Sequence, residues 1–201
     1  MHALLAAINC AKGPIEVNLA GHLAVIDTAD AGDLVLFPEM SLTGSVDPAS
    51  EPDRLVPLED PAVTTLAQAA RSGVTLCFGI AERGPDGEPY ITQLVAADGA
   101  AAAGAKLVLF PAAPGLHGRR TDEASWRSGF SWWQGCSLGD ASRHAKRLGL
   151  WIAQAGQAGT TKDEDFPGLA ALTGPDGQVV ARLPDWRAGV LAVDVPAGSS
   201  A

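Results

Sequence analysis

The sequence is short of cysteine, of aromatic residues and of long apolar segments, and each shortage excludes a class of protein. Three widely separated cysteines in 201 residues are too few for a disulfide framework or a zinc site. The longest apolar stretch, 99–116, is interrupted by Lys106, Pro111 and Pro114, so it does not predict a membrane-spanning helix. The N-terminus has no cationic lead-in, and we therefore expect no signal peptide and a cytoplasmic protein.

Positive charge is also scarce. The chain has 14 Lys and Arg against 23 Asp and Glu, with a formal net charge of −9 and a sequence pI near 4.7. A surface of this sign repels phosphates, which argues against a nucleic-acid partner. His117 and His144 are isolated in the sequence, and we expect neither a metal nor a cofactor.

The chain does contain short apolar runs that alternate with amphipathic ones. The spacing of apolar residues predicts helices at 14–31, 61–72 and 137–148. We predict strands at 4–10, 33–38, 74–82, 90–99, 106–111, 150–156 and 189–196, with a hairpin at 169–183. Strands that alternate with helices indicate an α/β fold, and the Pro/Gly-rich pieces are turn-sized, which indicates a single domain over 1–201.

Residues 118–136 have the composition of a loop, and Ser137 is a plausible N-cap for the helix that follows. Trp126, Trp132 and Trp133 form an aromatic cluster in this predicted loop. Two roles are open for the cluster. It lines a pocket or an interface, or it anchors the loop onto the core, which is the plainer role.

One phrase occurs twice. Residues 33–44 read DLVLFPEMSLTG and residues 106–115 read KLVLFPAAPG, but only the first copy carries a carboxylate, Glu39. Buried strands draw on few residue types, so the repeat is explained either by two similar helix–strand units or by composition alone. Glu39 directly follows a buried strand, and the carboxyl end of a strand is where α/β proteins usually place ligands.

The order of these features resembles the nitrilase, or carbon–nitrogen hydrolase, superfamily. Besides LVLFPE and Gly44, the resemblance rests on residues spread along the chain: Asn18, Ala29, Leu66-Ala67, Gly73-Val74, Gly79-Ile80, Glu82, GAKLVLFPA, FPGLAALTGPDGQVVARL and GVLAVDV. It divides the domain into an N-terminal part (1–99), a short connection (100–105) and a C-terminal part (106–196). It implies a four-layer αββα sandwich in which a Cys-Glu-Lys triad hydrolyses a small amide or nitrile. In that triad Glu39 is the general base for the thiol.

The connection is where this chain departs from the family. The resemblance implies a loop, a strand, the nucleophile turn and most of a helix there, and the chain has only AAAAGA, without cysteine or lysine. A crossover between parallel strands takes a dozen or more residues. We therefore expect the sandwich to be incomplete between 99 and 106, with apolar surface uncovered on the remaining strands. A natural deletion, a decayed relative and part of a longer protein all remain open.

No other residue replaces the triad convincingly. Cys136 precedes the predicted helix at 137–148, whose N-terminus would lower a thiol pKa, but a structural role is the plainer one. Cys77 and Cys10 are expected in the core, and Lys106 at the surface. The late helix and strand also depart from the family pattern, at Arg147, Leu148 and Gly156.

Three hypotheses follow for the function. The first is a carbon–nitrogen hydrolase of the amidase or nitrilase type, inactive in this chain because Cys and Lys are wanting. The second is a non-catalytic binding or assembly module with the same fold. The third, an unrelated doubly wound protein, is disfavoured by the order of Asn18 through Gly44. By analogy with the family, the protein is a possible homo-oligomer.

Overall fold

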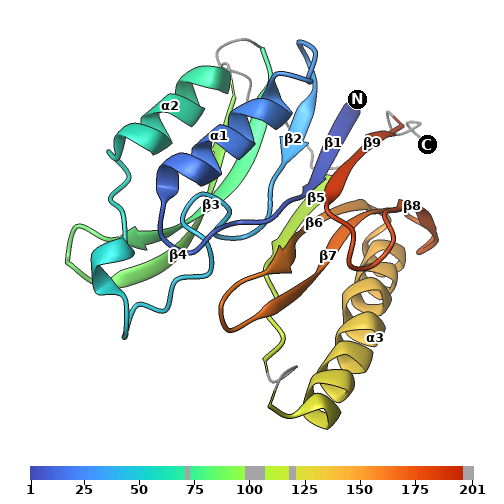
Figure 1. Ribbon diagram of the computed structural model, residues 1–201. Coiled ribbons are helices and arrows are strands. Elements are labelled where there is room, and N and C mark those ends of the chain that lie inside the picture. The colour runs from blue at the N-terminus through green and yellow to red at the C-terminus, as the bar shows by residue number, and fades with distance from the viewer. Residues whose placement is uncertain (71–72, 98–106, 118–120, 197–201) are drawn as a thin grey trace.

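Two β-sheets packed face to face form the centre of the protein, and helices cover their outer faces (Figure 1). The computed structural model describes residues 1–70, 73–97, 107–117 and 121–196. Helices α1 (Ile15–Ile26) and α2 (Pro61–Ala69) lie over the first sheet, and α3 (Glu123–Leu148) lies over the second. The predicted four-layer αββα architecture is therefore confirmed in the described residues.

The first sheet has the strand order β4-β3-β2-β1-β9. Its strands are β1 (His2–Ala7), β2 (Leu34–Leu36), β3 (Thr75–Arg83), β4 (Pro89–Ala96) and β9 (Gly189–Asp194). The central strands β1, β2 and β3 are parallel, and β9 and β4 add to them in the antiparallel sense. Apolar side chains on the helical face, including Val35, Phe37 and Phe78, pack beneath α1 and α2.

The second sheet has the order β5-β6-β7-β8. Its strands are β5 (Leu107–Ala112), β6 (Trp151–Thr160), β7 (Asp165–Thr173) and β8 (Val179–Arg182). Only β5 and β6 are parallel. A single 3₁₀ turn, η1 (Pro52–Arg54), interrupts the segment between β2 and α2.

Small side chains line much of the space between the sheets. Ala3 and Ala7 of the first sheet share a core cluster with Ala153 and Ala155 of the second. Alanines bring two backbones close together, and this packing sets β1 against β6 and β7. At the β4 edge the inner face is left uncovered: Ile91 and Val95 are 61% and 64% exposed.

The predicted loop at 118–136 is wrong for most of its length, because α3 begins at Glu123. Asp122 caps the helix by accepting a hydrogen bond from the Ser125 backbone N–H at 3.1 Å. Ser137 is not an N-cap; it lies inside the helix, where its hydroxyl donates to the Trp133 carbonyl. Helix interiors tolerate isolated glycines at a modest cost, and packing against the sheet outweighs it here.

The connection 100–105 lies outside the described residues. The strands on either side of it are in different sheets: β4 is antiparallel to β3, and β5 pairs with β6. The two strands are not parallel neighbours, so the predicted need for a crossover within one sheet does not apply. Whether a segment is missing stays a prediction. The two copies of LVLFP become β2 and β5, one in each sheet.

Among the described helices, none combines the length and the apolar character that crossing a membrane requires.

Candidate functional site

Glu39 lies just beyond the carboxyl end of β2, as the sequence predicted. The backbone leaving β2 is held against β3: the Phe37 N–H donates to the Cys77 carbonyl at 2.8 Å, and the Leu42 N–H to the Gly79 carbonyl at 3.0 Å. A Cβ at Gly79 would come within 2.5 Å of the Met40 nitrogen. Position 79 therefore has to be glycine for the segment that carries Glu39 to lie so close to the strand.

Asn18 connects two loops around Glu39. Its amide oxygen accepts from the Ala11 N–H at 2.8 Å, and its amide nitrogen donates to the carbonyls of Ala11 at 2.8 Å and Leu42 at 3.0 Å. The side chain is buried, so these bonds compensate fully for its loss of water. Asn18 thus ties the loop after β1 to the loop after Glu39. The family resemblance singled out this asparagine, but only the structure shows how it positions the loop.

A buried polar chain lies beneath the same loop. His22 Nδ1 is 2.7 Å from the Asn18 carbonyl, which can only accept, so Nδ1 carries the proton. Nε2 then accepts from the Ser41 hydroxyl at 2.9 Å. Burial, only partly offset by the bond to Asn18, lowers the pKa of His22 from an ordinary 6.5 to about 4. Ser41 and His22 are both fully buried, so this serine–histidine pair fixes the loop and is closed to a substrate.

The carboxyl ends of β2 and β5, the strands formed by the two LVLFP copies, lie beside each other. Ala113, just beyond β5, packs against the cluster that contains Met40, the residue after Glu39. The two strand ends therefore meet across the sandwich, at the edge where a ligand would be expected. The second copy brings only alanines to this place, so the carboxylate of Glu39 has no acidic counterpart there.

None of the three thiols is hydrogen-bonded to Glu39 in the part of the chain that the structure describes. Cys10 is buried in the loop after β1, and burial raises the pKa of its thiol to about 12. Burial also raises the pKa of Cys77, despite a hydrogen bond from Gln93 at 3.3 Å. Cys136 lies in the middle of α3, on the outer face of the second sheet, so it is not at a helix N-terminus, which was the reason for considering it as a nucleophile. Within the described ranges, no hydrogen bond or ion pair joins the Glu39 carboxylate to a cysteine.

Lys12 is the lysine in the loop after β1, and sequence reasoning did not single it out. Its ammonium is 2.9 Å from Asp163 and 2.6 Å from Glu164, in the turn between β6 and β7. Burial opposes the charge, but the hydrogen bonds that Lys12 donates to Glu164 and Asp163 prevail and raise the pKa of Lys12. Lys12 therefore holds two loops together, and its charge is already neutralised by carboxylates. Lys106 lies outside the described residues.

His117 and His144 are the two histidines that the sequence analysis considered as metal ligands. His117 Nε2 is 3.3 Å from Glu164, and His144 lies beside Arg147 on α3. In the described part of the chain, no group of three His, Cys, Asp or Glu side chains converges as a metal site would require.

Searches with family models and among curated proteins found no match to this sequence. Solved structures do match. An amidase from Nesterenkonia sp. AN1, with the acetamide moiety of fluoroacetamide bound at its active-site cysteine, has a TM-score of 0.74 at 20% identity, over 98% of this chain and 90% of that one. A CN-hydrolase superfamily protein from Xanthomonas campestris, with an arsenic adduct in its active site, has a TM-score of 0.71 at 14% identity, over 98% and 91%.

A larger enzyme matches over less of its length. The glutamine-dependent NAD+ synthetase from Acinetobacter baumannii has a TM-score of 0.62 at 17% identity, over 95% of this chain and 44% of the synthetase. None of these spans tests whether a segment is missing between Gly99 and Lys106. At such identities the likeness concerns the arrangement of the backbone alone. The chain has the fold of the nitrilase, or CN-hydrolase, superfamily.

Proposed function

We propose that this chain descends from thiol-dependent carbon–nitrogen hydrolases and that, as it stands, it does not hydrolyse amides or nitriles. The proposal rests on the three thiols. Two are buried with raised pKa values, and the third projects from α3 rather than toward Glu39. A thiol attacks an amide carbon only as the thiolate, and a base must lie beside it to take the proton.

Glu39 retains the base of that reaction without its partners. A carboxylate at this position is held by the close approach to Gly79 and by the Asn18 bonds, so its loop is preorganised. The developing oxyanion would also need a cation, and Lys12 is bound to Asp163 and Glu164. If residues are missing between Gly99 and Lys106, we propose that the parent protein acts on a small amide or nitrile. An intact mass of the natural protein distinguishes that parent from this chain.

The inactive chain is tested with a short aliphatic amide. With acetamide as substrate, ammonia release by the wild-type chain is expected to equal that of Glu39→Gln and of a buffer blank. A general base contributes roughly 10²- to 10⁴-fold to such a reaction, so a working site would separate the two proteins clearly. Turnover by the wild type that is lost in Glu39→Gln would contradict the proposal.

Thiol labelling of the native chain supplies an independent readout. We expect Cys136, which is half-buried, to react with Ellman's reagent at an ordinary rate, and Cys10 and Cys77 to react only after unfolding in urea. Acetamide should leave all three rates unchanged. A cysteine that reacts much faster than a free thiol, and that acetamide protects, would show an intact nucleophile.

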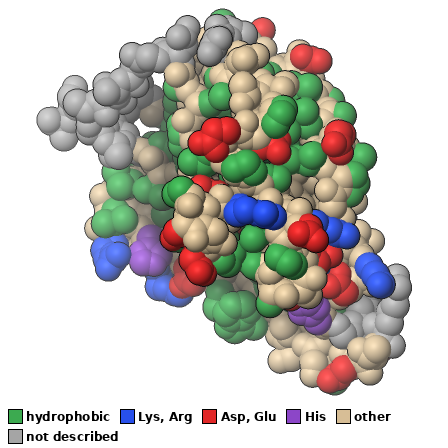
Figure 2. All heavy atoms as spheres, turned by 90° about the vertical axis from the view of Figure 1, so that its left-hand side faces the viewer, with side chains coloured by type: hydrophobic (Ala, Val, Ile, Leu, Met, Phe, Trp, Pro, Cys, Tyr) green, Lys and Arg blue, Asp and Glu red, His purple; other side chains and the backbone are tan. Residues whose placement is uncertain are grey.

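An assembly role is the second candidate, favoured by the uncovered inner face of β4. Ile91 and Val95 are exposed on an edge strand, and hydrophobic side chains lie open on the face drawn in Figure 2. Edge strands with apolar side chains invite pairing with another chain. We propose that two copies associate through this face, as a homo-oligomer.

Sedimentation velocity tests the association. Wild-type chain is expected to sediment as a dimer at tens of micromolar, and Val95→Lys as a monomer, because the charge would be buried unpaired in the interface. Val180→Lys is the matched control: Val180 is 60% exposed on β8, at the far edge of the other sheet, and its substitution should leave the dimer intact. A wild-type chain that stays monomeric would rule out this role.

A further inference from the structure

The outer face of β5 is only partly covered by α3, which packs mainly over β6 and β7. Trp133 of the helix packs with Leu169 of β7, and Ala141 packs with Ile152 of β6. Val108 is the β5 residue that packs against this second cluster, whereas Phe110, further along β5, is 49% exposed. A pocket of about 470 Å³ results between α3 and the two parallel strands.

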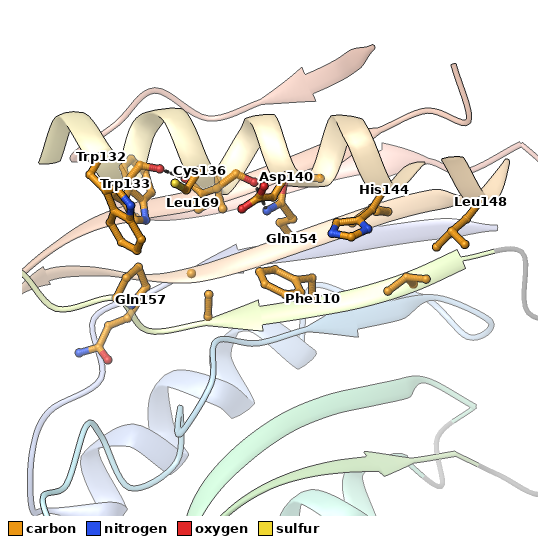
Figure 3. A pocket seen from close by; sticks show the side chains of 18 residues that line it. Phe110, Trp132, Trp133, Cys136, Asp140, His144, Leu148, Gln154, Gln157 and Leu169 are labelled. Atoms are coloured by element: carbon orange, nitrogen blue, oxygen red, sulfur yellow. Dashed lines mark hydrogen bonds between the residues drawn. The ribbon is translucent and has the colours of Figure 1, made fainter. Parts of the chain in front are cut away.

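The walls of this α3 pocket follow from the periods of its elements. Along α3, one face carries residues at four-residue spacing: Trp132, Cys136, Asp140, His144 and Leu148. Below it, strand residues paired in register point outward in alternation: Val108 with Ile152, Phe110 with Gln154, and Ala112 with Gly156. Figure 3 shows Trp132 and Trp133 at one end of the pocket, Leu148 at the other and Phe110 on the floor.

Two glutamines that line the pocket, Gln154 and Gln157, each have a buried amide oxygen without a hydrogen-bond partner. The amide nitrogen of Gln157 donates to the Cys10 carbonyl at 3.0 Å, in the loop after β1, so Gln154 is the one that is bonded to α3. Gln154 is fully buried, and its amide nitrogen donates to the Ser137 carbonyl at 3.0 Å. A carbonyl can only accept, so this bond fixes the orientation of the amide and leaves Oε1 as an acceptor. Oε1 has no hydrogen-bond partner. A buried acceptor without a donor is costly, and its position in the pocket wall is where a ligand could supply one.

We propose that the α3 pocket binds a small, largely apolar molecule that donates a hydrogen bond to Gln154 Oε1. The volume lies in the range of small-molecule sites, and aromatic walls with a few polar groups are typical of them. The pocket lies on the outer face of the second sheet, whereas Glu39 follows β2 of the first, so this site is separate from the candidate active site. The inference does not depend on whether the chain hydrolyses amides.

The donor is tested with a matched pair of probes, 2-naphthol and 2-methoxynaphthalene, which share an apolar body but differ in the hydroxyl proton. By calorimetry, the wild-type chain is expected to bind 2-naphthol on the order of tenfold more tightly, the ordinary worth of one buried hydrogen bond. In Gln154→Leu the two probes should bind within about twofold of each other. Gln68→Leu on α2, an exposed glutamine, should keep the wild-type preference.

Cys136 provides a second readout in the unmodified chain, in case Gln154→Leu does not fold. Its thiol lines the pocket, so saturating 2-naphthol should slow its maleimide labelling several-fold, followed by peptide mass spectrometry. Equal binding of the two probes to the wild type, an unchanged preference in Gln154→Leu, or unprotected Cys136 would each overturn the proposal. So would protection of Cys136 that grows with protein concentration without any probe, because a second copy would then fill the pocket.

Discussion

Gly44→Ala is expected to lower the free energy of unfolding by about 3 kcal/mol, the largest loss we expect from one added methyl group. Gly44 has φ of +75°, and a Cβ there would lie 2.5 Å from the Ala11 carbonyl oxygen. The added atom cannot be relieved by a side-chain rotation, because the neighbour is backbone. Asn18 holds that backbone by two hydrogen bonds, so moving it would also disturb the loop that carries Glu39.

Gly32→Ala separates backbone strain from the clash. Gly32 has a similar positive φ of +96°, but a Cβ there would meet nothing within 4 Å. Gly32→Ala should lower the free energy of unfolding by only about 1–2 kcal/mol, which is the strain of a left-handed residue alone. The two variants are compared by urea unfolding monitored by circular dichroism. Equal losses of unfolding free energy in the two variants would mean that the loop after Glu39 adapts to the added methyl group. The hydrogen bonds of Asn18 would then not hold the Ala11 backbone rigidly.

Acidification from pH 7 to pH 4.5 is expected to lower the free energy of unfolding by about 2 kcal/mol through His22 alone. The folded pKa of His22, about 4, lies below the ordinary value of 6.5 that applies to the unfolded chain. As the pH falls through 6.5, the His22 imidazole is protonated in the unfolded state but stays neutral in the folded state. Stability is therefore fully present above pH 6.5 and is lost between pH 6.5 and about pH 4.

His22→Gln tests the source of this acid lability. Glutamine can still pair with Ser41 but does not titrate, so the variant should be less stable at pH 7 and should show a much flatter pH dependence down to pH 4.5. His144→Gln, at an exposed histidine of α3, should keep the full wild-type slope. Urea midpoints at several pH values provide the measurement. A wild-type slope in His22→Gln would place the acid-sensitive group elsewhere.

Some parts of the site could be predicted because their signals are local. Glu39 follows an apolar run and a proline, and a carboxylate written directly after a buried strand emerges at that strand's end whatever the sheet order. Gln154 also left a signal that was not used: it is a polar residue inside the apolar run LWIAQAG, and a buried strand rarely carries a glutamine without a partner.

Other parts could not be predicted from local patterns. The start of α3 was placed fourteen residues too late because Gly129 and Gly135 resemble loop residues, and only packing against β6 and β7 shows that the helix continues through them. Because the helix begins earlier, Cys136 lies in the middle of a helix and not at the N-terminus of one. The pKa of Cys10 likewise depends on burial, which the flanking residues do not specify.

By itself the sequence determined that strands and helices alternate, that LVLFP would form a strand twice, and that a carboxylate would follow one copy and not the other. These properties depend on residues adjacent in the chain. Only the tertiary structure decided that the two copies enter different sheets, that their ends meet at Ala113 and Met40, and that α3 leaves a pocket over β5. These properties depend on packing between residues that are far apart in the sequence, and the burial of a side chain is fixed only when those residues pack together.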